Sequence, residues 1–144
     1  MRKHLAALGV ALLLSASGSV LAASSAGATA VGYASFPKKE FCIGSQCFSS
    51  SSGVLGHSII GSGKKADSQN ADAAGTSLCY TSFDFTRYNG TKLLSTSTGV
   101  RKAGCHAYNV RHDRNFTFPS NVTKSCAVYR NNGTSVVSQC HGIG

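Results

Sequence analysis

Histidines and their charged neighbours are the residues of this chain best suited to acid–base chemistry, because imidazole changes its charge near neutral pH. The run Arg111-His112-Asp113-Arg114 places such a group beside a carboxylate and two cations that can hold a phosphate. Consecutive residues of a strand point to opposite faces, so His112 and Asp113 share a pocket only if the chain turns there. We therefore favour a solvated charged segment and assign no catalytic residue.

Other kinds of reactive site have little support. No Gly-x-Ser-x-Gly motif marks a hydrolase nucleophile, and the paired carboxylates of a glycosidase are scarce among only five acidic residues. The cysteines and histidines lack the spacing of zinc ligands, so we expect neither a metal site nor a cofactor. Asp84 is predicted to be a surface partner of a basic neighbour.

The segment Cys42-Ile-Gly-Ser-Gln-Cys47-Phe-Ser-Ser-Ser resembles the N-terminal cysteine–serine segment of small secreted guanyl-specific fungal ribonucleases. That family needs a downstream glutamate base with flanking histidine and arginine, and no glutamate follows Glu40. The enzyme alternative is a basic ribonuclease-like hydrolase that uses two histidines, such as His57 and His112, with lysine or arginine stabilising the phosphorane. It requires His57, His106 or His112 to converge with basic residues in a cleft.

The chain is strongly basic, with 14 Lys and Arg residues, 5 Asp and Glu residues and a net charge of +9. Such a surplus favours anionic partners, among them nucleic acid, anionic lipid and acidic wall polymers. If the charge has a specific ligand, we expect it to bind between Arg101 and Arg130, where Asp113 is the only acid. The candidate binding residues are Arg101, Lys102, Arg111, His112, Arg114, Lys124 and Arg130.

The N-terminus has the three-part layout of an export signal, with basic residues at 2–4, an apolar run over 5–14 and small residues after it. The run is shorter than the roughly 20 apolar residues of a spanning helix, and no second stretch is longer. We expect cleavage after residue 23, with further cuts allowed up to Ala30. The product, with 12 basic and 5 acidic residues, is expected to be an extracellular monomer of charge +7.

Six cysteines lie beyond this signal, and in an exported chain an even number predicts three disulfides. Six cysteines allow 15 pairings, so local spacing has to decide among them. The first two are close enough to close a tight loop, and the last two flank a predicted hairpin. The sequence therefore predicts the sequential pairs Cys42–Cys47, Cys79–Cys105 and Cys126–Cys140.

Residues 78–88 alternate with period two and are rich in β-forming residues, which predicts a strand. The dipeptide Asn89-Gly90 follows at once and suits a type I′ turn. The resulting hairpin register places Phe85 opposite Leu94.

A second hairpin is predicted over residues 125–141, around Asn132-Gly133. A simple two-residue turn would place Cys126 opposite Gln139, one residue out of register with Cys140. We therefore expect a bulge or a longer loop in this hairpin.

Further strands are predicted over 54–60 and 103–110, whereas 61–77, with alanine as its only apolar residue, is predicted to be a flexible loop or one short helix. Short strands at regular spacing, few helix signals and 16 glycines predict an all-β fold, a small antiparallel sandwich or barrel. The mature length suits a single domain over 31–144.

The run Leu78-Cys79-Tyr80 to Phe85, then Gly104-Cys105, then Cys126 to His141, resembles a group of uncharacterised small secreted proteins of actinobacteria. The resemblance covers about 65 residues and implies export and a disulfide framework, with no activity to carry over. We expect a non-catalytic binding module that meets a cell envelope or an extracellular protein. The other alternative is a secreted protease inhibitor.

Overall fold

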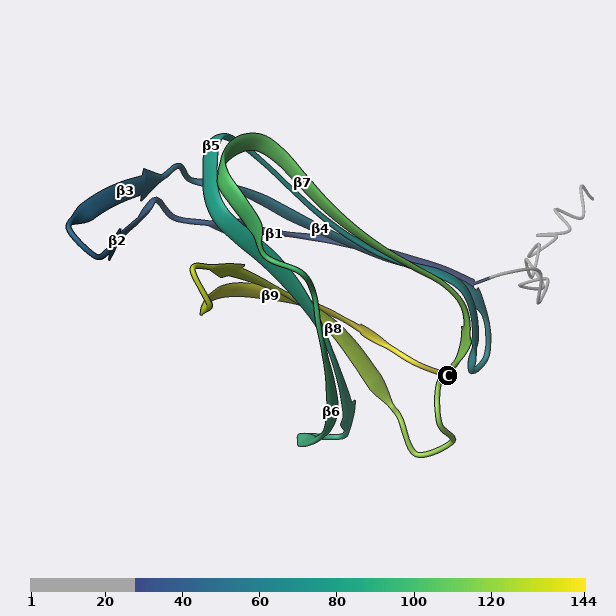
Figure 1. Ribbon diagram of the computed structural model, residues 1–144. Helices are drawn as coiled ribbons and strands as arrows, with labels where there is room; N and C mark the ends of the chain where they lie inside the picture. Colours follow the sequence, from purple (N-terminus) through teal and green to yellow (C-terminus); the bar gives the residue numbers. More distant parts are fainter. Residues whose placement is uncertain (1–27) are drawn as a thin grey trace, which may run out of the picture.

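The computed structural model describes residues 28–144, and most of the predicted export signal lies outside this part. Nine strands make up all of its regular secondary structure (Figure 1). They are β1 (Ala28–Phe36), β2 (Lys39–Ile43), β3 (Gln46–Ser50), β4 (Gly53–Ser62), β5 (Lys65–Asn89), β6 (Lys92–Thr98), β7 (Lys102–Thr117), β8 (Lys124–Asn131) and β9 (Thr134–Gly142). All pairings are antiparallel, which confirms the predicted all-β class. In residues 28–144 no helix is long and apolar enough to cross a membrane.

The 25-residue strand β5 organises the sheet, because each of its edges pairs with two strands in succession. One edge pairs first with β4 and then with β8, and the other pairs first with β7 and then with β6. Thr81 lies at the change of partners, since it is opposite both Lys102 of β7 and Asn131 of β8. Figure 1 shows β5 and β7 bending together near this point.

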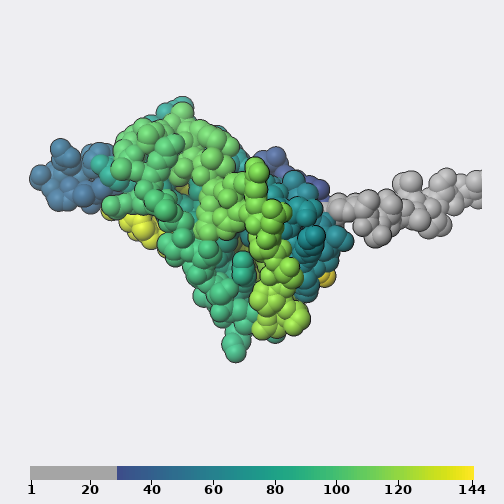
Figure 2. Space-filling model, turned by 45° about the vertical axis from the view of Figure 1, so that its right-hand side comes forward, coloured from purple at the N-terminus to yellow at the C-terminus, as the bar shows by residue number. Residues whose placement is uncertain are grey.

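The resulting sheet, in the order β1-β4-β5-β8-β9, curls into a nearly closed barrel. Its two outer strands approach each other so closely that a Cβ atom on Gly32 of β1 would collide with the side chain of Gln139 of β9. A larger residue at position 32 would therefore need the Gln139 side chain to move aside where the barrel closes. The β2–β3 hairpin is a separate two-stranded sheet that projects from the body as an arm (Figure 2).

The barrel interior is filled mainly by aromatic and aliphatic side chains. Phe36 stacks on Tyr129 with ring centroids 4.4 Å apart, and the Tyr129 ring also meets that of Phe83. A second apolar cluster closes one end of the barrel beneath Phe118. The main cluster contains Phe36, Leu55, Ala71, Ala73, Leu78, Phe83, Phe85, Ala127 and Tyr129.

All three predicted disulfides are confirmed, and each joins residues that are directly opposite on neighbouring strands. Cys79–Cys105 ties β7 to β5 close to the change of partners at Thr81. The strands predicted over 54–60 and 103–110 are also confirmed, within β4 and β7.

The prediction of a loop or helix over 61–77 is wrong, because residues 65–77 form the first half of β5. Ala71 and Ala73 face the core, while the alternating residues Asn70 and Asp72 are only partly buried. This strand is paired along both edges, with β4 and β7, so its backbone hydrogen bonds and burial outweigh the weak strand preference of alanine.

The first hairpin forms, but its predicted register is wrong. The turn residues are Gly90 and Thr91, and a bulge beside Arg87 leaves Phe85 opposite Ser97 instead of Leu94. Gly90 has a φ of 57° and donates its backbone N–H to Oγ1 of Thr123, a contact from a distant segment that no local pattern reveals.

The second hairpin is confirmed together with its bulge, which lies between Tyr129 and Arg130. Its two turn residues, Asn132 and Gly133, have φ values of 43° and 80°. Positive φ at both positions is the requirement of a type I′ turn. The bulge restores the register that the Cys126–Cys140 bond needs.

The disulfides should differ in their contribution to stability. Replacing Cys126 and Cys140 with alanine should lower the free energy of unfolding by about 2–5 kcal/mol, as for native bridges of small secreted domains. The same change at Cys42 and Cys47 should cost less, because that bond closes a shorter loop in an arm outside the main sheet. Urea melts of the two double variants would measure both losses in the free energy of unfolding. A greater loss for the Cys42 and Cys47 variant would contradict this ranking.

Candidate binding groove

Four of the seven predicted binding residues line three cavities on either side of the connection between β6 and β7. The first, the Arg111 cavity, has a volume of about 310 Å³; the second, the Arg101 cavity, about 470 Å³; and the third, the Lys124 cavity, about 440 Å³. The Arg101 and Lys124 cavities share Thr96 and Arg130, so they adjoin, and together they are called the basic groove. The groove is lined by Ser82, Asp84, Thr86, Tyr88, Leu93, Thr96, Thr98, Gly99, Arg101, Lys124, Cys126, Val128, Arg130, Asn132, Gly133, Ser135, Ser138 and Cys140.

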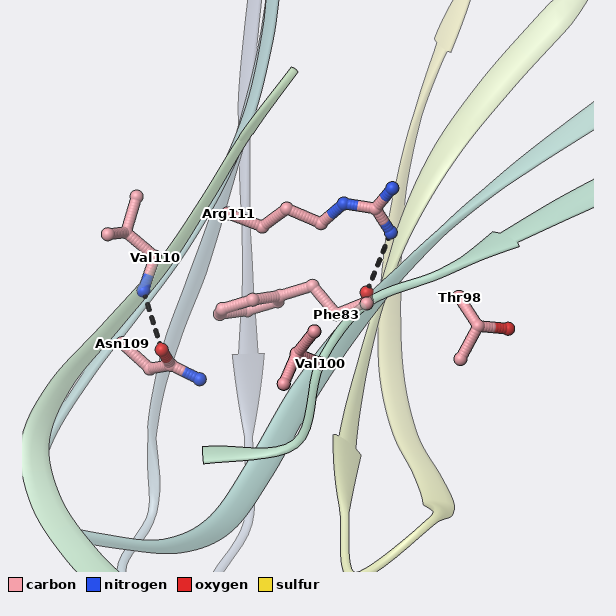
Figure 3. Close-up of a pocket in the computed structure, with 7 residues that line it drawn as sticks. Phe83, Thr98, Val100, Asn109, Val110 and Arg111 are labelled. Carbon is pink, nitrogen blue, oxygen red and sulfur yellow. Dashed lines mark hydrogen bonds between the residues drawn. The ribbon is translucent and has the colours of Figure 1, made fainter. Parts of the chain in front are cut away.

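The guanidinium of Arg111 is fully occupied by the protein (Figure 3). Nη1 donates to the carbonyl oxygens of Phe83 and Ser97, Nη2 to the Ser97 hydroxyl and Asp113, and Nε to Asp113. Arginine has five N–H donors, and these five contacts use them all. The group also lies 4.4 Å from the centroid of the Phe85 ring. Arg111 therefore joins β7 to β5 and β6 and has no donor left for a ligand.

Asp84 is the only acid that lines the groove, and its charge is already compensated. Its side chain is 4% exposed, and Oδ2 accepts a hydrogen bond of 2.5 Å from Nε of Arg130. Oδ1 accepts a hydrogen bond of 3.3 Å from the backbone N–H of Gly99. The predicted basic partner is present, but the predicted surface position is wrong, because β6 and the 99–101 connection pack against this side of β5.

Arg101 reaches the groove from the connection between β6 and β7. Its Nη1 donates to Oδ1 of Asn132 at 2.9 Å, and its guanidinium carbon lies 5.7 Å from the centroid of the Tyr80 ring. Tyr80 also contacts Phe41 and Phe48 of the arm edge to face. The Arg101 guanidinium is therefore held by the Tyr80 ring and by one side-chain amide. Its other N–H groups have no hydrogen-bond partner in residues 28–144.

The Lys124 cavity has a different character. Lys124 lies over the Tyr88 ring at 4.6 Å, and its neighbours are the Cys126–Cys140 disulfide and several hydroxyl groups. The hydroxyls that line the whole groove belong to Ser82, Thr86, Tyr88, Thr96, Thr98, Ser135 and Ser138. Sequence reasoning missed them as site residues, although Ser82, Thr86 and Tyr88 share the polar side of an alternating strand.

The other three predicted binding residues lie on β7, away from the groove. Lys102 donates to the carbonyl oxygen of Tyr108, and Nε of Arg114 donates to Nε2 of His112. The seven residues therefore do not form one patch. Arg101, Lys124 and Arg130 line the groove, Arg111 is structural, and the rest are exposed along an edge strand.

The histidines do not converge in a cleft as the enzyme alternative requires. His57 is 1% exposed inside the barrel, whereas His106 and His112 lie along β7, opposite Leu78 and Asn70. None of the five principal cavities of residues 28–144 is lined by a histidine. The same part of the chain contains no group of three side chains that could hold a metal ion.

His57 belongs to a buried polar cluster. Nε2 of Gln69 bridges Nε2 of His57 and the hydroxyl of Ser125, each at 2.9 Å, and all three side chains are shielded from solvent. Nε2 of the neighbouring His141 forms a hydrogen bond of 2.9 Å with the backbone carbonyl oxygen of His57. Burial lowers the pKa of His57 to about 3. Repulsion from a charged His141 also lowers this pKa, whereas a hydrogen bond to the Gln139 backbone raises it. The cluster is a neutral part of the core.

No known protein family, curated protein or solved structure matches this chain. The three disulfides of this small domain indicate an oxidising, extracellular environment. The groove therefore has to be interpreted from its own chemistry.

The neutral state of His57 predicts a pH dependence of stability. The unfolded chain binds a proton at this residue below its ordinary pKa of 6.5, whereas the folded chain does not until about pH 3. Stability should therefore fall as the pH drops from 6.5 towards 3, by on the order of 1 kcal/mol per pH unit. Urea melts at several pH values should show a shallower fall for His57→Gln.

The matched control is His106→Gln, which removes a partly exposed histidine outside the barrel core and should keep the wild-type slope. Equal slopes for His57→Gln and the wild type would show that His57 is not held neutral in the fold.

Proposed function

We propose that this protein is a secreted binding module and that its basic groove binds an acidic polysaccharide. The observation that carries the proposal is the composition of the groove: three cations, one acid that is already paired, and seven hydroxyl groups. Cations attract the acidic groups of such a polymer, and hydroxyls donate to and accept from its sugar hydroxyls. Secretion follows from the export signal expected over 1–23 and agrees with the disulfides.

The shape of the groove favours a polymer over a small molecule. Two cavities of about 470 and 440 Å³ adjoin at Thr96 and Arg130, and cations lie in both. A chain of acidic sugars can place successive charged groups near Arg101, Arg130 and Lys124. The long-range attraction comes from the net charge of the domain.

Single-stranded nucleic acid is a weaker candidate for the same groove. Proteins that bind it combine basic grooves with aromatic side chains on which bases stack. The only aromatic side chain that lines the groove is Tyr88, and Lys124 covers its ring. The groove offers hydroxyls where a nucleic-acid site would offer stacking surfaces.

Binding without catalysis is the simpler role for this set of residues. Asp84, the one carboxylate in the groove, is 4% exposed and accepts from Arg130 and Gly99, so it is poorly placed to act as a general base. The histidines that the hydrolase alternative would use line none of the principal cavities of residues 28–144.

Titration calorimetry with heparin and with polygalacturonate at several salt concentrations tests the proposal. Arg101→Gln and Lys124→Gln should each weaken binding about three- to tenfold and reduce the salt slope, because each removes one cation that displaces counterions, by analogy with phosphate contacts. Arg130 is left intact because its loss would strand Asp84 as a buried charge.

The matched controls are Arg114→Gln and Lys92→Gln, which remove exposed cations outside the groove. Both should bind like the wild type. An equal loss in all four variants would show that only net charge matters, and tighter binding of single-stranded RNA than of either polysaccharide would contradict the proposed ligand class.

A further inference from the structure

We propose that the Arg101 cavity contains a discrete subsite for one oxyanion group, a carboxylate, sulfate or phosphate, held between Arg101 and Arg130. The proposal rests on the proposed function, because it names the place in the groove where an acidic group of the polymer binds. The cavity, at about 470 Å³, also has room for the sugar ring that carries this group.

Arg130 is fixed from two sides before any ligand arrives. Its Nε donates to Asp84 at 2.5 Å, and Nη1 donates to the carbonyl oxygen of Gly133 at 3.0 Å. Its side chain remains 29% exposed, and Nη2 makes no hydrogen bond within residues 28–144. The edge of the guanidinium that carries Nη2 is therefore available to an anion.

Arg101 is fixed in a comparable way by Asn132 and by the face of the Tyr80 ring. Its Nε and Nη2 groups make no hydrogen bond within residues 28–144. The β8–β9 turn thus holds both arginines, one through the Asn132 side chain and the other through the Gly133 carbonyl. Because both turn residues have positive φ, the turn has a defined geometry that sets the two cations in place together.

Tyr80 acts as a positioning residue for Arg101. Its φ of 49° is a left-handed conformation that a bulky aromatic residue rarely adopts and that strains the backbone. The backbone N–H of Asn132 donates to its carbonyl oxygen at 2.8 Å, so the same residue contacts the turn and supports the Arg101 guanidinium. Strain of this kind is concentrated at binding sites, where the surrounding structure enforces it.

The chemistry of the cavity selects an oxyanion over a spherical anion. Two guanidinium groups present several N–H donors, and the hydroxyls of Ser82, Thr96 and Thr98 add others. Carboxylate, sulfate and phosphate offer two or more oxygens that can accept from different donors at once. Chloride has a single acceptor centre and cannot match the two parallel N–H bonds of a guanidinium with two separate acceptor atoms, so it should compete mainly through its charge.

The test uses inorganic sulfate as the probe in NMR titrations against a chloride background of equal ionic strength. Sulfate should shift the Nε–Hε signal of Arg101 and the backbone amides of Gly99 and Gly133 in a saturable manner. Arg101→Lys keeps the charge and loses the planar set of N–H donors of the guanidinium. It should weaken sulfate binding about tenfold and leave the salt slope of polysaccharide binding unchanged. Tyr80→Gly, which removes both the strain and the ring, should weaken sulfate binding without unfolding the domain.

The matched control is Arg114→Lys, which should titrate like the wild type. Absence of a saturable sulfate response while heparin still binds would overturn the subsite and leave the proposed function standing. A saturable response that Arg101→Lys does not change would also overturn it. Saturable sulfate binding in a protein that binds neither polysaccharide would support the subsite and refute the polymer as its source.

Discussion

The pairing of β5 along both of its edges is the constraint on which the rest of the structure depends. Each edge changes its partner near Thr81, and the single strand therefore has two different pairs of neighbours in succession within one seven-stranded sheet. Its first half supports β4 and β7, and its second half supports β6 and β8. One side of the second half presents Phe83 and Phe85 to the barrel core, and the other presents the polar side chains of the basic groove.

Two partly buried ion pairs lie at the junction that this change of partners creates. Arg111 and Asp113 join β7 to the carbonyl groups of β5 and β6, and Arg130 compensates Asp84 on the opposite side of β5. Removing one member of a buried pair leaves an uncompensated charge, which makes such pairs hard to lose. The basic residues of this region therefore have two roles: some maintain the junction, and others remain available at the groove.

Local patterns explain what the sequence could predict. The second hairpin follows from the turn residues Asn132-Gly133, Cys42–Cys47 from a spacing of five residues, and Cys126–Cys140 from its place at the base of that hairpin. Cys79–Cys105 is then the remaining pair, and the structure confirms all three. The strand over 65–77 was not, because its stability comes from two flanking strands and not from its alanines. Seven basic residues could be proposed as binding residues from the density of basic side chains between 101 and 130 alone. Which of them share a groove depends on strand pairing, so the sequence could not separate Arg111 from Arg101 and Arg130.

We propose that the basic groove, and not the charge of the whole surface, binds the polymer. Backbone chemical-shift mapping during titration with a defined heparin oligosaccharide tests it most directly. We expect the largest shifts at residues on both sides of the groove, around 82–86, 98–101, 124–133 and 135–140. Shifts concentrated along β7 at Lys102, His112 and Arg114, or spread evenly over all exposed lysines and arginines, would contradict it.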